Sequence, residues 1–202
     1  MLSRSEKKCD RVVTCMNPEF PFQLADAKDR LSFMSTLEID IRHLETADAG
    51  SLSEVFASAW DEAYRGIVPD VDLRRIASRR GPDYWTHVAQ NAARQVLVLS
   101  LDNTARGYVT FGHNRHNRIP AQGEIYELYV DPVCQGAGLG RRLLDAARRK
   151  LAEQRRKGLV IWALAGNDRA DNFYRRCGGH VAGEDNIRFF GRNYRRIAYL
   201  WQ

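Results

Sequence analysis

Three glycines at alternate positions mark the most chemically specific segment of this chain. Gly136, Gly138 and Gly140 separate a predicted strand at residues 124–130 from a predicted helix at residues 141–156. Because glycine has no β-carbon, the backbone there can adopt positive φ and bring its N–H groups close to a ligand. Successive N–H groups at the start of a helix form an anion site, which the helix dipole reinforces. The segment therefore predicts a site for a pyrophosphate.

Two common phosphate-binding loops fit this segment poorly. A Walker A loop ends in Gly-Lys-Ser/Thr, whereas Gly140 is followed by Arg141 and Arg142. A dinucleotide fingerprint needs a different glycine spacing and an acidic residue after the next strand, and the chain has neither. A nucleotide-binding protein is therefore the last of three candidate functions. The remaining pattern is Gln-x-x-Gly-x-Gly, from Gln135 to Gly140, which taken alone could also be a tight turn of small residues.

A second block downstream has the spacing Asn-x-x-Ala-x-x-Phe-Tyr, from Asn167 to Tyr174. Together with the strand Glu-Ile-Tyr-Glu-Leu-Tyr-Val at residues 124–130 and the glycine loop, this block resembles the GNAT superfamily of N-acetyltransferases. The resemblance covers about residues 37–201 in element order and is most specific over residues 124–178. The chain departs from the family at Gly179, where an aromatic residue is usual, and we expect looser packing at that turn.

The resemblance implies an α+β (mixed α/β) fold with a mostly antiparallel central sheet, splayed middle strands and helices on both faces. It also implies that acetyl-CoA binds in the splay as a co-substrate. By position, the backbone of Tyr129 and Val130 would pair with the pantetheine arm, the glycine loop would hold the pyrophosphate, and Asn167 would bond the cofactor arm. The implied cofactor-binding residues are Tyr129, Val130, Gln135, Gly136, Ala137, Gly138, Leu139, Gly140, Arg141, Asn167 and Phe173.

Acetyl transfer to an amine needs a base and an acid. A free amine is mostly protonated at neutral pH, so a group or a water molecule must take its proton, and the leaving thiolate benefits from a proton donor. The backbone N–H of Val130 fits the family position that polarises the carbonyl oxygen. Tyr174 is the expected general acid. The alternative is that Tyr174 is simply a half-buried tyrosine on a helix.

Two carboxylates compete for the role of base. Glu124 and Glu127 are three residues apart, so a regular strand would place them on opposite faces and only one would face the cleft. A bulge in the strand, which is usual in the family, could change which one does. Glu124 matches the position where several family members carry their base and is slightly preferred, while Glu127 is nearer to the reacting carbon along the chain. Water could also take the proton.

The acceptor site is predicted in the segment from Trp60 to Gly66, where the family lines its acceptor pocket. Asp61 and Glu62 could attract a cationic amine, or could be exposed residues at a helix end. Tyr64 belongs to the same predicted surface, and Trp60 also suits the core. The sequence does not identify the acceptor, which could be a small amine, an amino acid, an antibiotic or a protein N-terminus.

Other chemistry has weaker support. His113 and His116 lie in a predicted loop without an evident third ligand, so no metal site is expected. A nucleophilic role for Cys134 would need a nearby His or acidic residue, which the sequence alone does not identify. The main alternative to an enzyme is a non-catalytic acyl-CoA-binding or sensing domain, which would have kept the loop and lost turnover.

The elements that must position these residues follow from hydrophobic periodicity. Alternation of Leu37, Ile39 and Ile41 predicts the first strand, and Asp102-Asn103 predicts a hairpin turn. The first predicted helix is capped by Thr46 or Asp48 and ends at Tyr64. The other predicted helices span residues 70–79, 82–94, 141–156 and 171–176. The remaining predicted strands span residues 95–101, 107–111, 124–130, 159–165, 181–185 and 194–201. The order is an antiparallel start, one strand–loop–helix–strand crossover and a closing hairpin.

The composition limits the class of protein that this chain can be. The chain has 202 residues, of which 44% are hydrophobic and 28% charged, as in one globular domain. Residues 1–33 lack clean periodicity and predict a poorly ordered extension to an acetyl-CoA-binding domain at residues 34–202. No apolar run approaches the length of a membrane span, the polar residues 1–10 hold no signal core, and the four cysteines form no framework. A cytoplasmic protein without a membrane partner is predicted.

The positive charge is concentrated in one helix. The net charge is +6, and residues 141–157 carry eight basic against two acidic residues, so the whole excess lies there. A nucleic-acid binder usually shows a broader basic face, so no nucleic acid is expected as a partner. The far end of the helix could simply be solvated. Acetyl-CoA and an amine acceptor are the expected partners, and a homodimer stays open.

Overall fold

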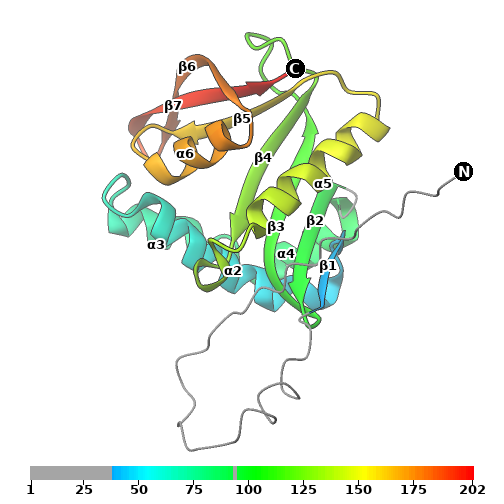
Figure 1. Cartoon of the computed structure of the whole chain (residues 1–202). Coiled ribbons are helices and arrows are strands. Elements are labelled where there is room, and N and C mark those ends of the chain that lie inside the picture. The colour runs from blue at the N-terminus through cyan, green and yellow to red at the C-terminus, as the bar shows by residue number, and fades with distance from the viewer. Residues whose placement is uncertain (1–37, 93–94) are drawn as a thin grey trace, which may run out of the picture.

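The computed structural model describes residues 38–92 and 95–202, so the extension predicted at residues 1–33 lies outside the described part. One sheet has the strand order β1-β2-β3-β4-β5-β7-β6 (Figure 1). Every neighbouring pair is antiparallel except β4 and β5, which are parallel. This confirms the predicted mixed, mostly antiparallel sheet. The strands are β1 (Ile39–His43), β2 (Val96–Leu101), β3 (Thr104–His113), β4 (Gly123–Val130), β5 (Leu159–Leu164), β6 (His180–Phe189) and β7 (Arg192–Trp201).

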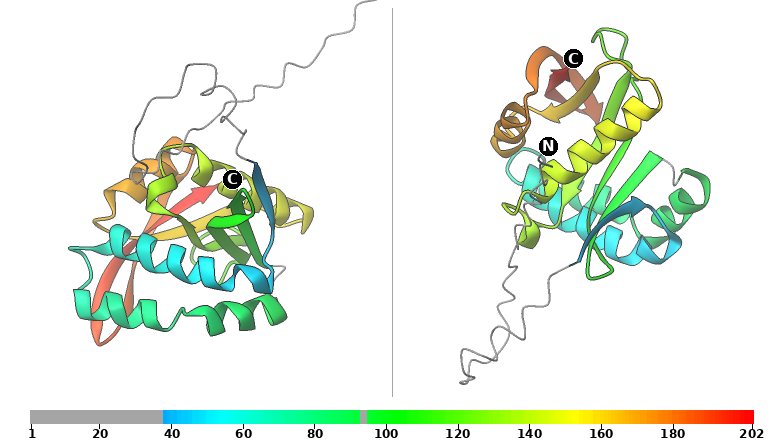
Figure 2. Two further views of the ribbon diagram at one scale, coloured as in Figure 1. Left: turned by 90° about the horizontal axis from the view of Figure 1, so that it is seen from below. Right: turned by 45° about the vertical axis from the view of Figure 1, so that its right-hand side comes forward.

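Helices cover both faces of the sheet (Figures 1 and 2). On one face, the core beneath α5 and α6 includes Phe111, Ile125 and Leu143. On the other face, the core beneath α2 and α4 includes Phe56 and Trp85. The helices of the described part are α2 (Ala49–Tyr64), α3 (Asp70–Ser78), α4 (Pro82–Ala92), α5 (Leu139–Glu153) and α6 (Asp168–Arg176), with short 3₁₀ turns at Thr46–Asp48 and Pro132–Cys134. None of these helices is long and apolar enough to cross a membrane.

Two hairpins are longer than the sequence predicts because their turns are only two residues long. Asp102 and Asn103 have φ of 46° and 62°, so the β2–β3 ladder starts at Thr104 and not at Gly107. Phe190 and Gly191, with φ of 49° and 76°, likewise join β6 directly to β7. The strand alternation was too weak in these segments to extend the predicted strands to the turns.

Two helices begin earlier than predicted because of their caps. The Asn167 side-chain oxygen accepts the backbone N–H of Ala170 at 3.0 Å, so α6 starts at Asp168 and not at Asp171. Gly138 is the N-cap of α5 with φ of 79°, so that helix starts at Leu139. These shifts add three residues to the start of α6 and two residues to the start of α5.

The middle of the sheet splays. β4 and β5 pair only from Gly123–Ile125 to Leu159–Ile161, although both strands continue beyond these residues. Figure 1 shows the two strands running apart from this short contact. The far half of β4 therefore has a neighbour on the β3 side only, which opens the sheet between its two halves.

A β-bulge in β4 reverses one expectation. Gly112 of β3 faces Glu124, and Thr110 of β3 faces Glu127, so three residues of β4 span two residues of β3. Since Gly112 and Thr110 share a face of the sheet, Glu124 and Glu127 share it as well. The opposite-face arrangement expected for a regular strand is wrong, because Tyr126 is the extra residue at the bulge.

The turn after α6 is tightly packed, contrary to the looser packing expected there. A β-carbon on Gly179 would lie 2.5 Å from the Trp201 ring, so the indole occupies the space of a side chain. The Trp201 Nε1–H also donates to the Cys177 carbonyl at 2.9 Å. An aromatic ring from β7 therefore fills the turn in place of an aromatic residue at position 179.

Candidate active site

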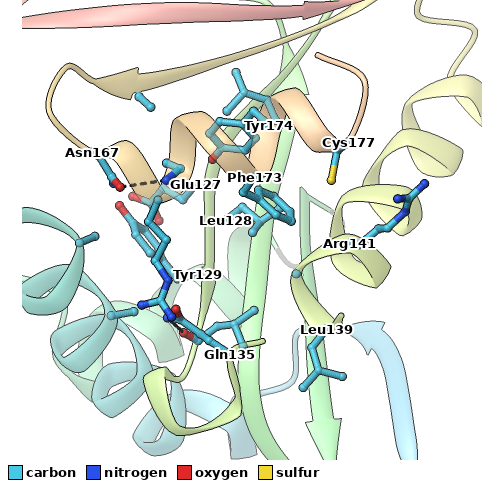
Figure 3. A pocket seen from close by; sticks show the side chains of 18 of the residues that line it. Glu127, Leu128, Tyr129, Gln135, Leu139, Arg141, Asn167, Phe173, Tyr174 and Cys177 are labelled. Carbon is cyan, nitrogen blue, oxygen red and sulfur yellow. Dashed lines mark hydrogen bonds between the residues drawn. The ribbon is translucent and has the colours of Figure 1, made fainter. Parts of the chain in front are cut away.

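A cavity of about 570 Å³ opens where β4 and β5 separate (Figure 3). Its walls come from five elements that are far apart in the sequence: the end of α2, both splayed strands, the glycine loop and α6. Of the predicted site residues, those that line it are Tyr64, Glu127, Tyr129, Val130, Gln135, Gly136, Gly138, Leu139, Gly140, Arg141, Asn167, Phe173 and Tyr174. The glycine loop and the Asn167–Tyr174 block therefore line the same cavity.

The glycine loop is shaped to expose backbone N–H groups. Gly136 and Gly138 have φ of 82° and 79° with open space where a β-carbon would be, so conformation and not crowding requires glycine there. The Gln135 side chain fixes the loop by donating to the Val130 carbonyl at 2.9 Å. The first backbone N–H groups of α5 have no partner within the helix. Leu139 and Gly140, which carry two of these groups, line the cavity. This arrangement suits an anion.

The open edge of β4 presents a different pair of residues from the pair expected. Asp131 N–H bonds to Arg106 of the β3 side, while the Val130 carbonyl bonds to Gln135 on the open side. Backbone groups alternate along a strand, so Leu128 and Val130 point toward the opening, and Tyr129 points to β3. This alternation favours Leu128 over Tyr129 for backbone pairing with a ligand. The Tyr129 side chain still lines the cavity.

Tyr174 lies on α6 with its hydroxyl toward the cavity (Figure 3). Its side chain is 7% exposed and packs against Tyr199 and Trp201, with ring centroids 5.1 and 6.1 Å away. Burial, and then the nearby Tyr64, raise the pKa of Tyr174 above the usual tyrosine value. The hydroxyl therefore keeps its proton at any pH near neutrality.

The two candidate bases have different surroundings. Glu127 lines the cavity, and its two carboxylate oxygens accept from Arg80 at 2.6 Å and from the Tyr108 hydroxyl at 3.0 Å. Glu124 is 1% exposed and lies outside the cavity lining. Its carboxylate accepts from the backbone and the guanidinium of Arg115 at 2.8 and 2.7 Å. The slight preference for Glu124 finds no support in this geometry.

Of the three predicted acceptor residues, only Tyr64 lines the cavity. Tyr64 lines the cavity, where burial raises its pKa more than hydrogen bonds from Tyr129 and Asn167 lower it. Trp60 lies in the apolar layer beside Tyr64 and Asp61 pairs with Arg65, and neither Trp60 nor Asp61 lines the cavity.

Arg169 of α6 lines the cavity although it had no place in the prediction. It forms an ion pair with Glu62 of α2, which also lines the cavity and was expected to attract a cationic amine or to be exposed at a helix end. Arg169, Phe173 and Arg176 follow one helical face of α6, a periodicity hidden by the late predicted start of that helix. Ala137, expected at the cofactor, is partly buried and packs against the core beneath α5 instead of lining the cavity.

Within residues 38–92 and 95–202, no group of three or more His, Cys, Asp or Glu side chains could hold a metal ion. His113 bonds through its ring to Arg156, and His116 packs edge-on against Trp162. These two histidines therefore have separate partners.

Comparisons with known proteins agree with the fold. The model of the acetyltransferase (GNAT) family matches residues 52–179. An uncharacterized N-acetyltransferase of Archaeoglobus fulgidus is 29% identical over 133 residues, which are 65% of this chain and 88% of the relative. The PaiA N-acetyltransferase of Thermoplasma acidophilum in complex with coenzyme A superposes with a TM-score of 0.65 at 18% identity, over 80% of this chain and 98% of that one. The yncA protein of Salmonella typhimurium with its cofactor acetyl-CoA has a TM-score of 0.59 at 21% identity, over 81% and 93%.

The family match spans more than half of the chain, and the sheet has the splayed architecture that the motifs implied. The chain belongs to the acetyltransferase (GNAT) family. Its enzyme class is accordingly that of the acetyl-CoA-dependent N-acetyltransferases.

Proposed function

We propose that this protein moves an acetyl group from acetyl-CoA directly onto a primary amine, with Tyr174 as general acid and Glu127 as base. One observation carries the proposal. The glycine loop, an open strand edge, a protonated tyrosine and a carboxylate all line the same cavity. The cofactor-binding domain is the predicted unit at residues 34–202.

Different parts of the cavity suit the pyrophosphate, the pantetheine arm and the thioester of acetyl-CoA. The N–H groups of Gly138, Leu139 and Gly140, with Arg141 beside them, suit the pyrophosphate. The open backbone edge at Leu128 and Val130 suits the amide-rich pantetheine arm, much as an added strand pairs with a sheet edge. In this arrangement the Val130 N–H polarises the thioester carbonyl.

The proton transfers follow from the surroundings of the two side chains. As the amine nitrogen bonds to the carbonyl carbon, Glu127 accepts the proton that the nitrogen gives up, directly or through water. As the C–S bond breaks, Tyr174 donates its proton to the departing sulfur. The raised pKa of Tyr174 keeps that proton available, because burial disfavours the phenolate. Solvent then restores the two protonation states.

The acceptor approaches from the Tyr64 side of the cavity. There Tyr64 and the Glu62–Arg169 pair line the wall from α2 and α6. Glu127 supplies a negative charge for an ammonium group. The acceptor class that follows is a primary amine of small size or at a chain end.

Thermal unfolding with acetyl-CoA tests the cofactor, with NAD and ATP as controls. At about 100 times its dissociation constant a ligand adds roughly 2.7 kcal/mol to the free energy of unfolding, which raises Tm by several degrees. A panel of primary amines is then screened for thiol release from acetyl-CoA. A Tm raised equally by all three ligands, or by none, overturns the proposal. A rise with acetyl-CoA but no thiol release with any amine favours the non-catalytic sensing domain.

A further inference from the structure

Glu127 is held by a residue from a distant part of the chain. Arg80 lies in the turn between α3 and α4, 47 positions before Glu127, and its Nη2 is 2.6 Å from the Glu127 Oε1. The Tyr108 hydroxyl donates to the other oxygen at 3.0 Å. Each carboxylate oxygen therefore has one fixed donor and keeps a second lone pair that can face the cavity.

Arg80 is itself fixed. Its guanidinium stacks over the Tyr84 ring at 4.3 Å and lies 5.4 Å from the Phe56 ring. A second nitrogen of the guanidinium hydrogen-bonds to the Tyr84 hydroxyl. A planar cation held on an aromatic face and directed at a carboxylate is an arrangement that arginine can make and lysine cannot reproduce.

The surroundings of Glu127 contain more phenols than charges. Burial works to lower the pKa of Arg80, but Glu127 together with the neighbouring tyrosines outweighs it and raises that pKa, so Arg80 stays cationic. The titratable and charged groups that face Glu127 are Arg80 from the α3–α4 turn, Tyr84 from α4, Tyr108 from β3, Tyr129 from β4, Tyr64 from α2 and, further away, Arg115 from the β3–β4 loop. Arg80 is the cation among them that contacts the carboxylate.

We propose that Arg80 is a positioning residue for acetyl transfer, which aims the Glu127 carboxylate at the acceptor amine and balances its charge in the splay. The inference rests on the proposed role of Glu127. It makes the α3–α4 turn part of the catalytic apparatus, although Arg80 does not line the cavity. Through Arg80, the turn between α3 and α4 contacts the proposed base on β4.

The test is chemical rescue of Arg80→Ala. Thiol release is followed with acetyl-CoA and the best amine of the wild-type screen, with and without guanidinium chloride at concentrations far below those that unfold proteins. Removal of the guanidinium should lower kcat on the order of 100-fold, because a misaimed group costs about that much. Free guanidinium should restore at least a tenth of the lost rate by entering the space beside Tyr84. Arg80→Lys should recover kcat only in part.

Arg42→Ala is the matched control. Arg42 forms a similar pair with Asp48 at 2.7 Å and is 28% exposed, against 26% for Arg80, but it lies on β1 away from the cavity. This variant should keep the wild-type kcat and gain no rate from guanidinium. Acetyl-CoA should raise the Tm of both variants as it raises that of wild type, which shows that the cofactor site is intact.

The outcomes separate the two proposals. A kcat of Arg80→Ala within threefold of wild type overturns the positioning role. The role is also overturned if Arg42→Ala loses kcat as well and guanidinium restores the rate of both variants equally. A lost rate without rescue, in a variant that still binds acetyl-CoA, assigns Arg80 to structure alone. In each case wild-type turnover stands and supports the proposed function. Failure of wild type itself to release thiol overturns the proposed function, and the role of Arg80 falls with it.

Discussion

Replacing Tyr174 by phenylalanine should abolish most of the turnover and leave the fold unchanged. The variant loses only the hydroxyl, since the ring keeps its contacts with Tyr199 and Trp201. The stability change should be about 1 kcal/mol or less, because only one hydroxyl is removed and the ring stays packed. A general acid contributes about 10²- to 10⁴-fold to the rate, so the barrier should rise by roughly 3–5 kcal/mol.

The pH dependence of the wild type follows from the same residue. Burial, with Tyr64, Tyr199 and Cys177 nearby, raises the pKa of Tyr174. A general acid acts in its protonated form, and a raised pKa keeps that form populated to higher pH. The wild-type rate should therefore show no alkaline decline near pH 10, where an ordinary tyrosine loses its proton.

Tyr199→Phe provides the matched control, because its ring neighbours Tyr174 but does not line the cavity. That change removes the 2.6 Å hydrogen bond to the Asp171 carboxylate and should cost about 1.5–3 kcal/mol of unfolding free energy. Thiol release at saturating acetyl-CoA gives kcat, and urea unfolding gives stability. The reasoning is refuted if Tyr174→Phe keeps kcat within threefold, or if the less stable Tyr199→Phe loses as much rate.

Three further predictions concern the loop, the base and a distant ion pair. Gly138→Ala and Gly191→Ala should each lose about 1–2 kcal/mol of stability, because both positions have positive φ with free space, but only Gly138→Ala should weaken acetyl-CoA binding, by tenfold or more in calorimetry. Glu127→Gln should lower kcat about 100-fold at unchanged acetyl-CoA affinity, and an unchanged kcat would leave water as the base. Burial works to raise the pKa of Asp48, but hydrogen bonds from Arg42 and a backbone N–H outweigh it and lower that pKa, so the pair stabilises the fold above the unfolded value of 3.8 and loses this contribution as pH falls through the folded pKa. Arg42→Met should therefore cost about 1–3 kcal/mol at pH 7 and progressively less below pH 4 in urea titrations, and an equal cost at both pH values would contradict it.

The local patterns of the sequence predicted the elements well. Gly136 and Gly138 lie between a strand and a helix as expected, and Gly140 lies in the first turn of that helix. Asp102-Asn103 forms the turn of a hairpin. Helix ends were less predictable, since the cap at Asn167 depends on a side-chain hydrogen bond that periodicity does not reveal. The missed first turn of α6 carries Arg169, a cavity residue.

The sequence by itself indicated the family, the glycine loop and the tyrosine on α6. These features are local, because an anion site needs only successive N–H groups at a helix start, and motif spacing records them directly. Only the tertiary structure shows how the surroundings of Glu124 and Glu127 differ. A single extra residue at Tyr126 places both carboxylates on one face, and the divergence of β4 from β5 exposes only Glu127 to the cavity. The contact of Arg80 with Glu127 joins residues 47 positions apart, and such a contact exists only once the helices have packed onto the sheet.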